Sequence, residues 1–411
     1  MMANLFSRHA HDVFETGFYS EDFDFEVRIQ LGQAPYGGSD VGEVLRTIAD
    51  VKDGDHEGWQ RAWSALGGRL TTQAAASADA GHRASAAAAY LRAANAYSPA
   101  VSAAAALGDE DLLQHTFRAH RAAWDAFVDH ASYPAERLAI PYEDTTMPGY
   151  FFRADADGTK APTLILVNGS DGSISSMWAT GGLGGLQRGY NVLMFDGPGQ
   201  QSMLFDRGIP FRYDWEAVIT PVVDALVARD DVDADRIAAY GISQAGYWLP
   251  RALAFEHRIA AAVADPGVVD VSQSWRAGIP KSEMELVEKG EKEKFDRGME
   301  MALRYSKSVA RLWNFRAKPF GKDSPYDTMV EMLRYRLDPE VAAKITTPLL
   351  ITAPEKEQFW PGQSEQLAAM VPDATLQQFT ADEGADYHCQ PLARLLTDER
   401  MFDWLDARLR R

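Results

Sequence analysis

Ser243 lies between small residues at the end of an apolar run, where a serine could act as a nucleophile. The run, residues 237–240, leads into residues 241–246 (Gly-Ile-Ser-Gln-Ala-Gly), and a helix-compatible segment follows. A strand, a sharp turn carrying a serine and a helix together describe a nucleophile elbow. Small residues on either side of the serine let the strand and the helix approach closely enough for that turn. So short a pattern also arises by chance, so its meaning depends on the partners that such a serine needs.

The first partner is a base, because a serine hydroxyl is a poor nucleophile until its proton is removed. Seven of the nine histidines precede Ser243, and only His257 and His388 follow it. His257 is expected near the end of the helix after the elbow, at the surface. His388 lies in a polar loop, residues 383–390, between a strand-like run and the closing helix. We therefore predict that His388 is the general base.

The second partner is an acid that orients the imidazole and stabilises its positive charge. Glu355 and Glu357 both follow a buried strand-like run at residues 348–352. We predict Glu357 as the acid and Glu355 as its competitor, with Asp382 and Asp386 as more distant alternatives.

An oxyanion site needs two preorganised N–H donors. The backbone N–H of Gln244, directly after the serine, is one. The other is expected from residues 168–172 (Asn-Gly-Ser-Asp-Gly), which follow a short apolar run and contain glycines that let N–H groups turn inward. Ser170 is the preferred donor and Asp171 the second choice.

Aromatic residues gather in the sequence near these loops. They would suit a flat or aromatic substrate, although ordinary packing explains such residues as well. We predict the following as substrate-binding residues: Asp171, Trp178, Tyr247, Trp248 and Trp275.

The composition excludes several classes of binding partner and of site. Its formal charge is −18, from 41 basic and 59 acidic residues, which argues against nucleic acid or an anionic membrane as the main partner. A single cysteine, Cys389, excludes an internal disulfide and a cysteine-rich metal site. No His/Asp cluster has the spacing of metal ligands, so we expect no metal. We also expect no cofactor, and a small molecule as the substrate.

The chain carries no sign of a membrane span or of export. No apolar run approaches the roughly 20 residues that a spanning helix needs. Residues 1–9 lack the charged-then-apolar pattern of a signal peptide. We therefore predict a cytoplasmic protein.

Residues 1–135 contain almost no strand signal. Apolar residues recur at helical spacing, and glycines or proline at residues 32, 37–38, 54, 67–68 and 98–99 divide the region into four or five helices. Such a block could cover an active site, form a dimer surface, or do both, and we expect a homodimer.

From about residue 136 the sequence contains strand-like runs. Residues 139–153 read as a short antiparallel pair, and five short apolar runs follow that are typical of strands buried on both faces: residues 163–167, 191–196, 237–240, 259–264 and 348–352. Helical segments at residues 182–188, 215–229 and 247–255 separate them. This alternation predicts a mostly parallel, doubly wound sheet.

A charged, helical segment interrupts the alternation where a lid over the sheet would be inserted. We therefore divide the chain into an N-terminal helical region (1–135), a first part of the core (136–267), a helical lid (268–340) and a second part of the core (341–411). Within the lid, Arg276, Lys281, Trp313 and Arg316 are candidates to face a substrate, besides Trp275.

Taken together, these features resemble the α/β-hydrolase superfamily. Within it, the chain resembles the helical-capped serine hydrolases that include fungal pigment polyketide-shortening enzymes and the nicotine-pathway C–C bond hydrolase (2,6-dihydroxypseudooxynicotine hydrolase-like). Five matching pieces occur in order: residues 168–172, 196–200 (Asp-Gly-Pro-Gly-Gln), 241–246, 359–363 (Phe-Trp-Pro-Gly-Gln) and 384–390 (Gly-Ala-Asp-Tyr-His-Cys-Gln). The resemblance implies the α/β-hydrolase fold with an N-terminal helical cap and a helical insertion before the last strands.

The resemblance also implies roles for the three candidate residues: Ser243 as nucleophile, His388 as base and Glu357 as acid. Many members carry the acid four residues before a proline, the spacing of Glu357 from Pro361, although the family more often has aspartate there.

The predicted function is a serine hydrolase that cleaves a C–C bond next to a ketone, or an ester, in a small aromatic or polyketide-like substrate. An acyltransferase or cyclase, or an aminopeptidase-like amidase, would use the same three residues. A non-catalytic binding protein of this fold would lack one of them. A metallohydrolase would need a ligand cluster, and a dinucleotide-binding dehydrogenase would need its glycine motif directly after a strand, which residues 181–185 do not follow.

Overall fold

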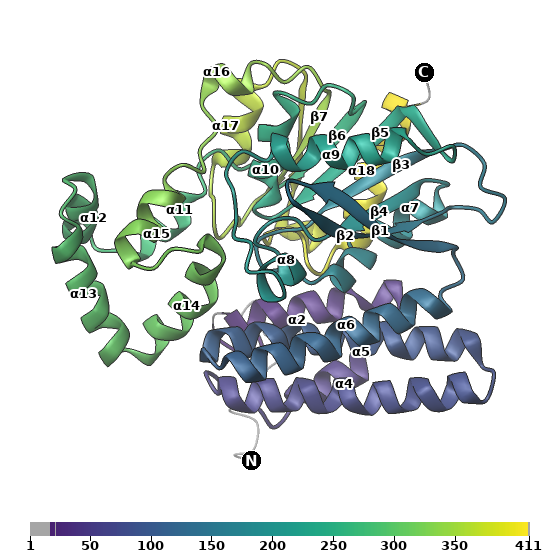
Figure 1. The fold of residues 1–411 in the computed structure, drawn as a ribbon, viewed down its shortest axis with the longest axis horizontal. Coiled ribbons are helices and arrows are strands. Elements are labelled where there is room, and N and C mark those ends of the chain that lie inside the picture. The colour runs from purple at the N-terminus through teal and green to yellow at the C-terminus, as the bar shows by residue number, and fades with distance from the viewer. Residues whose placement is uncertain (1–16, 21, 410–411) are drawn as a thin grey trace, which may run out of the picture.

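The computed structural model describes residues 17–20 and 22–409 (Figure 1). The expectation drawn from residues 1–9 therefore lies outside the described residues. Within the described part, no helix has both the length and the apolar character needed to cross a membrane.

The described residues form one sheet of eight strands in the order β1-β2-β4-β3-β5-β6-β7-β8. The first two pairings, β1 with β2 and β2 with β4, are antiparallel, and all the others are parallel. The predicted strands are confirmed, and their bounds are β1 (Ala135–Tyr142), β2 (Thr145–Phe152), β3 (Ala161–Val167), β4 (Asn191–Phe195), β5 (Val232–Ile242), β6 (Ala261–Asp265), β7 (Leu349–Pro354) and β8 (Ala374–Phe379).

Both faces of the sheet are buried, because successive side chains of a strand point to opposite faces. On β3, Leu164 and Leu166 belong to one hydrophobic cluster, while Ile165 and Val167 belong to another. The first face packs against α7 (Gly182–Gln187) and α18 (Arg394–Leu409), and the second against α9 (Glu216–Val227), α10 (Ala245–Leu253) and α17 (Gln363–Met370). Short turns of helix, η2 (Ile174–Trp178), α8 (Gln201–Phe205) and η4 (Ala381–Glu383), complete the connections.

The N-terminal helices share the first of these clusters with the sheet and stack beneath it in Figure 1. Trp124 lies edge-on to Phe152 of β2, and Phe127 packs against Trp178. The region is thus continuous with the core of the sheet. Its elements are α2 (Asp22–Gly32), η1 (Ala34–Tyr36), α3 (Val41–Ile48), α4 (His56–Asp79), α5 (Arg83–Leu107) and α6 (Glu110–His130).

The prediction that residues 67–68 and 98–99 end helices is wrong. Residues 67–68 lie inside α4 and residues 98–99 inside α5. A Cβ on Gly67 would lie 2.8 Å from the ring of Tyr97, so this glycine allows α4 and α5 to pack closely instead of ending a helix. The buried face of each helix outweighs the local preference of glycine and proline.

A helical insertion lies between β6 and β7, in the region predicted to be a lid. In Figure 1, α12 and α13 project from one side of the molecule, and α14 returns toward the N-terminal helices. Arg311 donates to the carbonyl of Gly54 at 3.2 Å, and Asn314 to the carbonyl of Ala106 at 3.4 Å. The lid elements are α11 (Ser272–Gly278), α12 (Lys281–Glu288), α13 (Lys292–Tyr305), α14 (Lys307–Ala317), η3 (Lys318–Phe320), α15 (Pro325–Met332) and α16 (Pro339–Ala342).

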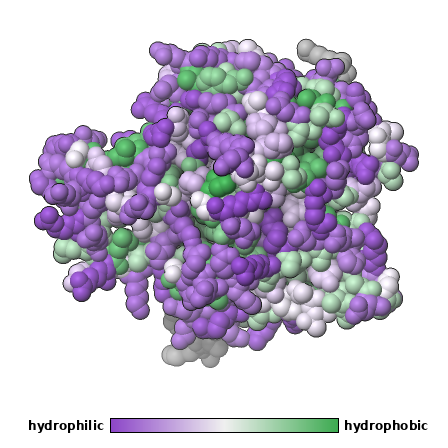
Figure 2. Space-filling view, viewed as in Figure 1, coloured by the Kyte–Doolittle hydropathy of each residue, from purple (hydrophilic) through white to green (hydrophobic). Residues whose placement is uncertain are grey.

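The exterior in Figure 2 is mostly hydrophilic over the helical insertion, whereas white and pale green residues of intermediate hydropathy appear at the lower right, over the N-terminal helices. Larger apolar side chains exposed on the lid include Met301, Tyr305 and Leu312, near the bend between α13 and α14.

A buried acid links the N-terminal helices to the sheet layer and generates a prediction. Asp398 of α18 accepts a hydrogen bond from the Tyr36 hydroxyl at 2.8 Å, and burial raises the pKa of its carboxyl to about 6. An aspartate whose pKa is higher in the folded than in the unfolded state destabilises the fold progressively as pH rises from about 4 to 6. We expect Asp398→Asn to raise the free energy of unfolding by about 2 kcal/mol at pH 7.5, with a smaller gain toward pH 4.

Denaturant unfolding across this pH range measures the effect. The matched control is Asp403→Asn, which removes an exposed carboxylate from the same helix. A gain at Asp398 that is equal at both ends of the pH range would contradict the explanation by burial.

Candidate active site

Ser243 occupies the sharp turn between β5 and α10, in the backbone conformation that an elbow needs. Its φ is 57°, in the left-handed region that few non-glycine residues adopt. Its N–H donates to the carbonyl of Asp265 at 2.6 Å, and its own carbonyl accepts from Gly246 at 2.8 Å. A Cβ on Gly246 would lie 1.8 Å from the carbonyl oxygen of Pro266, so only glycine fits where the turn meets the neighbouring strand. The predicted elbow is present.

The structure brings the three residues of the predicted triad together. His388 Nε2 lies 2.9 Å from Ser243 Oγ, and His388 Nδ1 lies 2.9 and 2.8 Å from the two carboxylate oxygens of Glu357. The side chains of His388 and Glu357 are only 4% and 5% exposed, so water screens their interaction little.

The carboxylate of Glu357 is held in its charged form. Burial by itself would raise its pKa, but the charge and hydrogen bond of His388 and the N–H groups of Phe359 and Trp360 together lower it below its usual value. Those two N–H groups donate to Glu357 Oε1 at 2.9 and 3.2 Å.

The alternative acids lie elsewhere. Glu355 is exposed and accepts from the N–H of Ala381, and Asp382 is also exposed. Asp386 is buried and forms an ion pair with Lys356 at 2.9 Å. The other late histidine, His257, is exposed, as expected, and contacts Thr346. Among these groups, Glu357 is the one that the structure hydrogen bonds to His388.

The loop after β3 lies beside the serine. A Cβ on Gly169 would stand 2.8 Å from Cβ of Ser243 and 3.4 Å from its Oγ, so the loop approaches at backbone distance. The N–H of Gly169 is already donated to Asn168 Oδ1 at 2.8 Å. Gln200 braces the loop from the next segment, because its amide nitrogen donates to the carbonyls of Asn168 and Gly169 at 2.7 and 3.1 Å.

On the other side of the serine, Gln244 opens α10 and is 5% exposed. Among the described residues, none is hydrogen bonded to its buried side-chain nitrogen Nε2.

Comparison with known proteins identifies the family. The sequence profile described as "Alpha/beta hydrolase family" matches residues 164–396, which is more than half of the chain. The chain belongs to the alpha/beta hydrolase family. It is 29% identical to the hydrolase LUC6 of a Fusarium species (96% of this chain, 97% of that protein) and 28% identical to the 20-hydroxy-prefusarin hydrolase FUS2 of Gibberella moniliformis (95% and 97%).

The fold of this hydrolase also resembles that of a solved relative. The crystal structure of the 2,6-dihydroxy-pseudo-oxynicotine hydrolase superposes with a TM-score of 0.71 at 19% identity, covering 92% of this chain and 95% of that one. At this identity the likeness bears on the fold, and it extends through the N-terminal helices because it covers nearly the whole chain.

Three of the aromatic residues predicted to bind substrate lie instead in the hydrophobic cores of the hydrolase. Trp248 and Tyr247 are fully buried, and the Trp248 ring stacks on Trp215 with centroids 4.4 Å apart. Trp178 is 5% exposed and packs against Phe152 at 5.4 Å. Tyr247 and Trp248 lie on the face of α10 that packs against one face of the sheet, and Trp178 of η2 belongs to the cluster on the other face. Their contact with a substrate stays a prediction.

The other predicted contacts lie nearer the surface and involve the lid. Trp275 of α11 is half-buried, with its ring 5.7 Å from that of Trp313. Asp171, in the loop after β3, forms an ion pair with Arg316 of α14. The lid candidates Arg276 and Lys281 are exposed.

Helix α2 contributes residues to the site that the sequence did not indicate. The ring of Phe25 lies 6.1 Å from the His388 imidazole and 6.0 Å from Phe359, which itself lies 4.7 Å from His388. The guanidinium of Arg28 stands 4.5 Å above the ring of Tyr387, next to the histidine in sequence. Helical spacing alone does not distinguish a residue that faces a site from one that faces a core.

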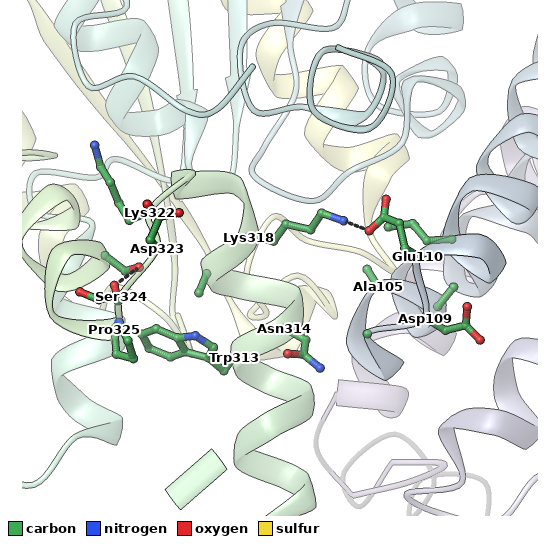
Figure 3. A pocket seen from close by; sticks show the side chains of 15 residues that line it. Ala105, Asp109, Glu110, Trp313, Asn314, Lys318, Lys322, Asp323, Ser324 and Pro325 are labelled. Carbon is green, nitrogen blue, oxygen red and sulfur yellow. Dashed lines mark hydrogen bonds and ion pairs between the residues drawn. The ribbon is translucent and has the colours of Figure 1, made fainter. Parts of the chain in front are cut away.

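A cavity of about 290 Å³ lies between the junction of α5 with α6 and the lid (Figure 3). Trp313 and Asn314 approach it from α14, and the ion pair of Lys318 with Glu110 joins its two sides. None of Ser243, His388 and Glu357 lines it. This space is therefore distinct from the immediate surroundings of the serine.

Metal-ligating groups do not cluster in the described part of the hydrolase: no three His, Cys, Asp or Glu side chains there are placed to hold an ion.

The close backbone contact at Gly246 gives a prediction. We expect Gly246→Ala to lower the free energy of unfolding by about 1–3 kcal/mol, because its methyl group would overlap a backbone carbonyl that has no room to withdraw. The matched control is Gly278→Ala, where a Cβ would meet no atom within 4 Å. Chemical denaturation of both variants measures the difference, and equal stability would contradict the packing described for the elbow.

Proposed function

We propose that this hydrolase cleaves an acyl bond, either a C–C bond next to a ketone or an ester, through an acyl-enzyme on Ser243. The observation that carries the proposal is the continuous hydrogen-bonded chain from Ser243 Oγ through His388 to Glu357, with contacts of 2.8–2.9 Å. A serine, an imidazole and a buried carboxylate in this arrangement are the components of nucleophilic acyl transfer.

In the first half of the reaction, His388 Nε2 accepts the proton of Ser243 as Oγ forms a bond to the substrate carbonyl carbon. Glu357 keeps the Nδ1–H directed toward itself and stabilises the imidazolium that forms. The carbonyl oxygen becomes an oxyanion, for which the N–H groups of Gln244 and Ser170 are the proposed donors. Ser170 is preferred over Gly169 because the N–H of Gly169 is already donated to Asn168.

In the second half, the tetrahedral intermediate collapses and the bond to the leaving group breaks. Where the substrate carries a second carbonyl next to the departing carbon, that carbon leaves as an enolate, and the one proton on His388 converts it to a ketone; an ester instead releases an alkoxide that takes this proton to become the alcohol. Water then gives a proton to His388 and attacks the acyl carbon, and the released Ser243 Oγ recovers that proton. The products are a carboxylic acid and a ketone or an alcohol.

The proposed substrate is small and aromatic or polyketide-like. Phe25 and Phe359 stand beside His388, so flat apolar faces lie next to the proposed base. Two similar proteins support this class, since their names give 20-hydroxy-prefusarin and 2,6-dihydroxy-pseudo-oxynicotine as what they act on.

The four-part division of the chain, its homodimeric state and its cytoplasmic location remain predictions. Sedimentation of the purified chain measures the oligomeric state directly.

The first functional prediction concerns Ser243. We expect Ser243→Ala to lower turnover of a p-nitrophenyl ester by about 10³-fold or more while the fold stays intact, because no other group there can form the acyl-enzyme. A fluorophosphonate should label wild type at Ser243 but not the variant, as mass spectrometry would show. Wild-type turnover in the variant would refute the proposal, and incorporation of ¹⁸O from labelled water into the acid product distinguishes hydrolysis from acyl transfer.

The second functional prediction separates the two neighbouring glutamates. We expect Glu357→Gln to reduce kcat by about 10²–10⁴-fold, because a neutral amide no longer stabilises the imidazolium. Glu355→Gln removes a charge two residues away that does not contact His388, and we expect it to change kcat less than about twofold. Steady-state kinetics on both variants decides, and the reverse ranking would assign the acid to Glu355.

A further inference from the structure

The turn that carries His388 has an unusual backbone. The two residues that follow, Cys389 and Gln390, have φ values of 57° and 44°, and both are non-glycine residues in the left-handed region. Such conformations are costly and persist where surrounding contacts hold them. Both residues are buried, so those contacts come from inside the protein.

The contacts that hold this turn lead to one residue, Asp265, at the end of β6. Gln390 Nε2 donates to Asp265 Oδ1 at 3.0 Å. Arg394 donates from Nη1 both to the carbonyl of Cys389 at 2.8 Å and to Asp265 Oδ2 at 3.3 Å. The far side of Gln390 is fixed as well, because its Oε1 accepts from Thr397 at 3.1 Å.

The carboxylate of Asp265 is fully buried and receives hydrogen bonds from four different segments. Besides Gln390 and Arg394, Tyr240 of β5 donates to Oδ2 at 2.5 Å, and Thr352 of β7 donates to Oδ1. Arg394 also donates to the Tyr240 hydroxyl at 2.9 Å. A buried negative charge is tolerated here because a cation and three further donors compensate for its desolvation.

The backbone of the same residue holds the serine. The carbonyl of Asp265 accepts the Ser243 N–H at 2.6 Å and the Cys389 thiol at 3.3 Å. Burial raises the pKa of Cys389 well above its usual value, so the thiol keeps its proton and remains a donor. One residue is thus bonded both to the turn that presents the nucleophile and to the turn that presents the base.

We propose that Asp265 is a positioning residue for the reaction at Ser243: its carboxylate, through Gln390 and Arg394, sets the distance between His388 and Ser243. The inference rests on the proposed function. Asp265 does not contact His388 or the substrate position; it acts by holding two strained turns in register. Gln390 is the direct link, since it is part of the strained turn and its side chain donates a hydrogen bond to Asp265.

The test uses two variants and a fluorophosphonate probe, whose rate reports the chemical step without requiring the natural substrate. Gln390→Met removes the amide link but keeps the length of the side chain. Asp265→Asn keeps the shape of the side chain. It cannot accept from all four donors, because its amide nitrogen Nδ2, itself a donor, would face the donor group of either Gln390 or Arg394. We expect the maximal inactivation rate, kinact, to fall by about 10- to 100-fold in both, as a misplaced base would cause, while the probe constant KI stays within twofold.

The matched control is Tyr36→Phe, which removes a buried hydrogen bond of 2.8 Å to α18 on the N-terminal side. It should lower the unfolding midpoint without changing kinact. All rates are divided by the folded fraction, which circular dichroism measures under the assay conditions. If Asp265→Asn does not fold, Gln390→Met alone still decides the question.

The outcomes separate the two proposals. Wild-type kinact in Gln390→Met overturns the positioning role, and so does a loss that disappears after division by the folded fraction or that lies in KI. Failure of the probe to label Ser243 in the wild-type protein instead overturns the proposed function. A fall in kinact with unchanged KI, absent in Tyr36→Phe, supports the positioning role.

Discussion

The left-handed backbone of Ser243 is the constraint on which the rest of the site depends. A side chain in that conformation projects from the turn, but the conformation is costly and must be held by contacts from elsewhere. Here the next strand supplies them: the carbonyl of Asp265 takes the serine N–H, and the carbonyl of Pro266 occupies the space that a larger residue at 246 would need. The parallel pairing of β5 with β6 is therefore what presents the hydroxyl to His388.

The helical regions differ in how they relate to this centre. The N-terminal helices share a hydrophobic cluster with one face of the sheet, and α2 places Phe25 near His388. The insertion between β6 and β7 shares the hydrophobic cluster on the other face of the sheet through Phe320, Met329 and Tyr335. Its helix α14 also bonds to the N-terminal helices through Arg311, and Arg316 pairs with Asp171 of the loop after β3.

Local sequence features located some parts of the site and not others. The strands, the elbow and the position of His388 in a late loop follow from local apolar runs and from the order along the chain, and these expectations agree with the structure. The sequence did not indicate that the aromatic residues Trp178, Tyr247 and Trp248 lie in cores, or that Phe25, more than 200 residues before the serine, lies beside His388. Residue type and proximity in sequence do not tell which face of an element a ring occupies.

The sequence by itself determined the class of the fold and pointed to Ser243 and His388 as candidates, because strand periodicity, turn residues and chain order can be read directly along the chain. Only the tertiary structure decided between Glu355 and Glu357 as the partner of His388, because two carboxylates two residues apart differ in direction and not in chemistry. Only the tertiary structure, likewise, brought Asp265, Gln390 and Arg394 into one buried network. Their interaction depends on the packing of β6 against the last loop and helix, which no spacing along the chain encodes.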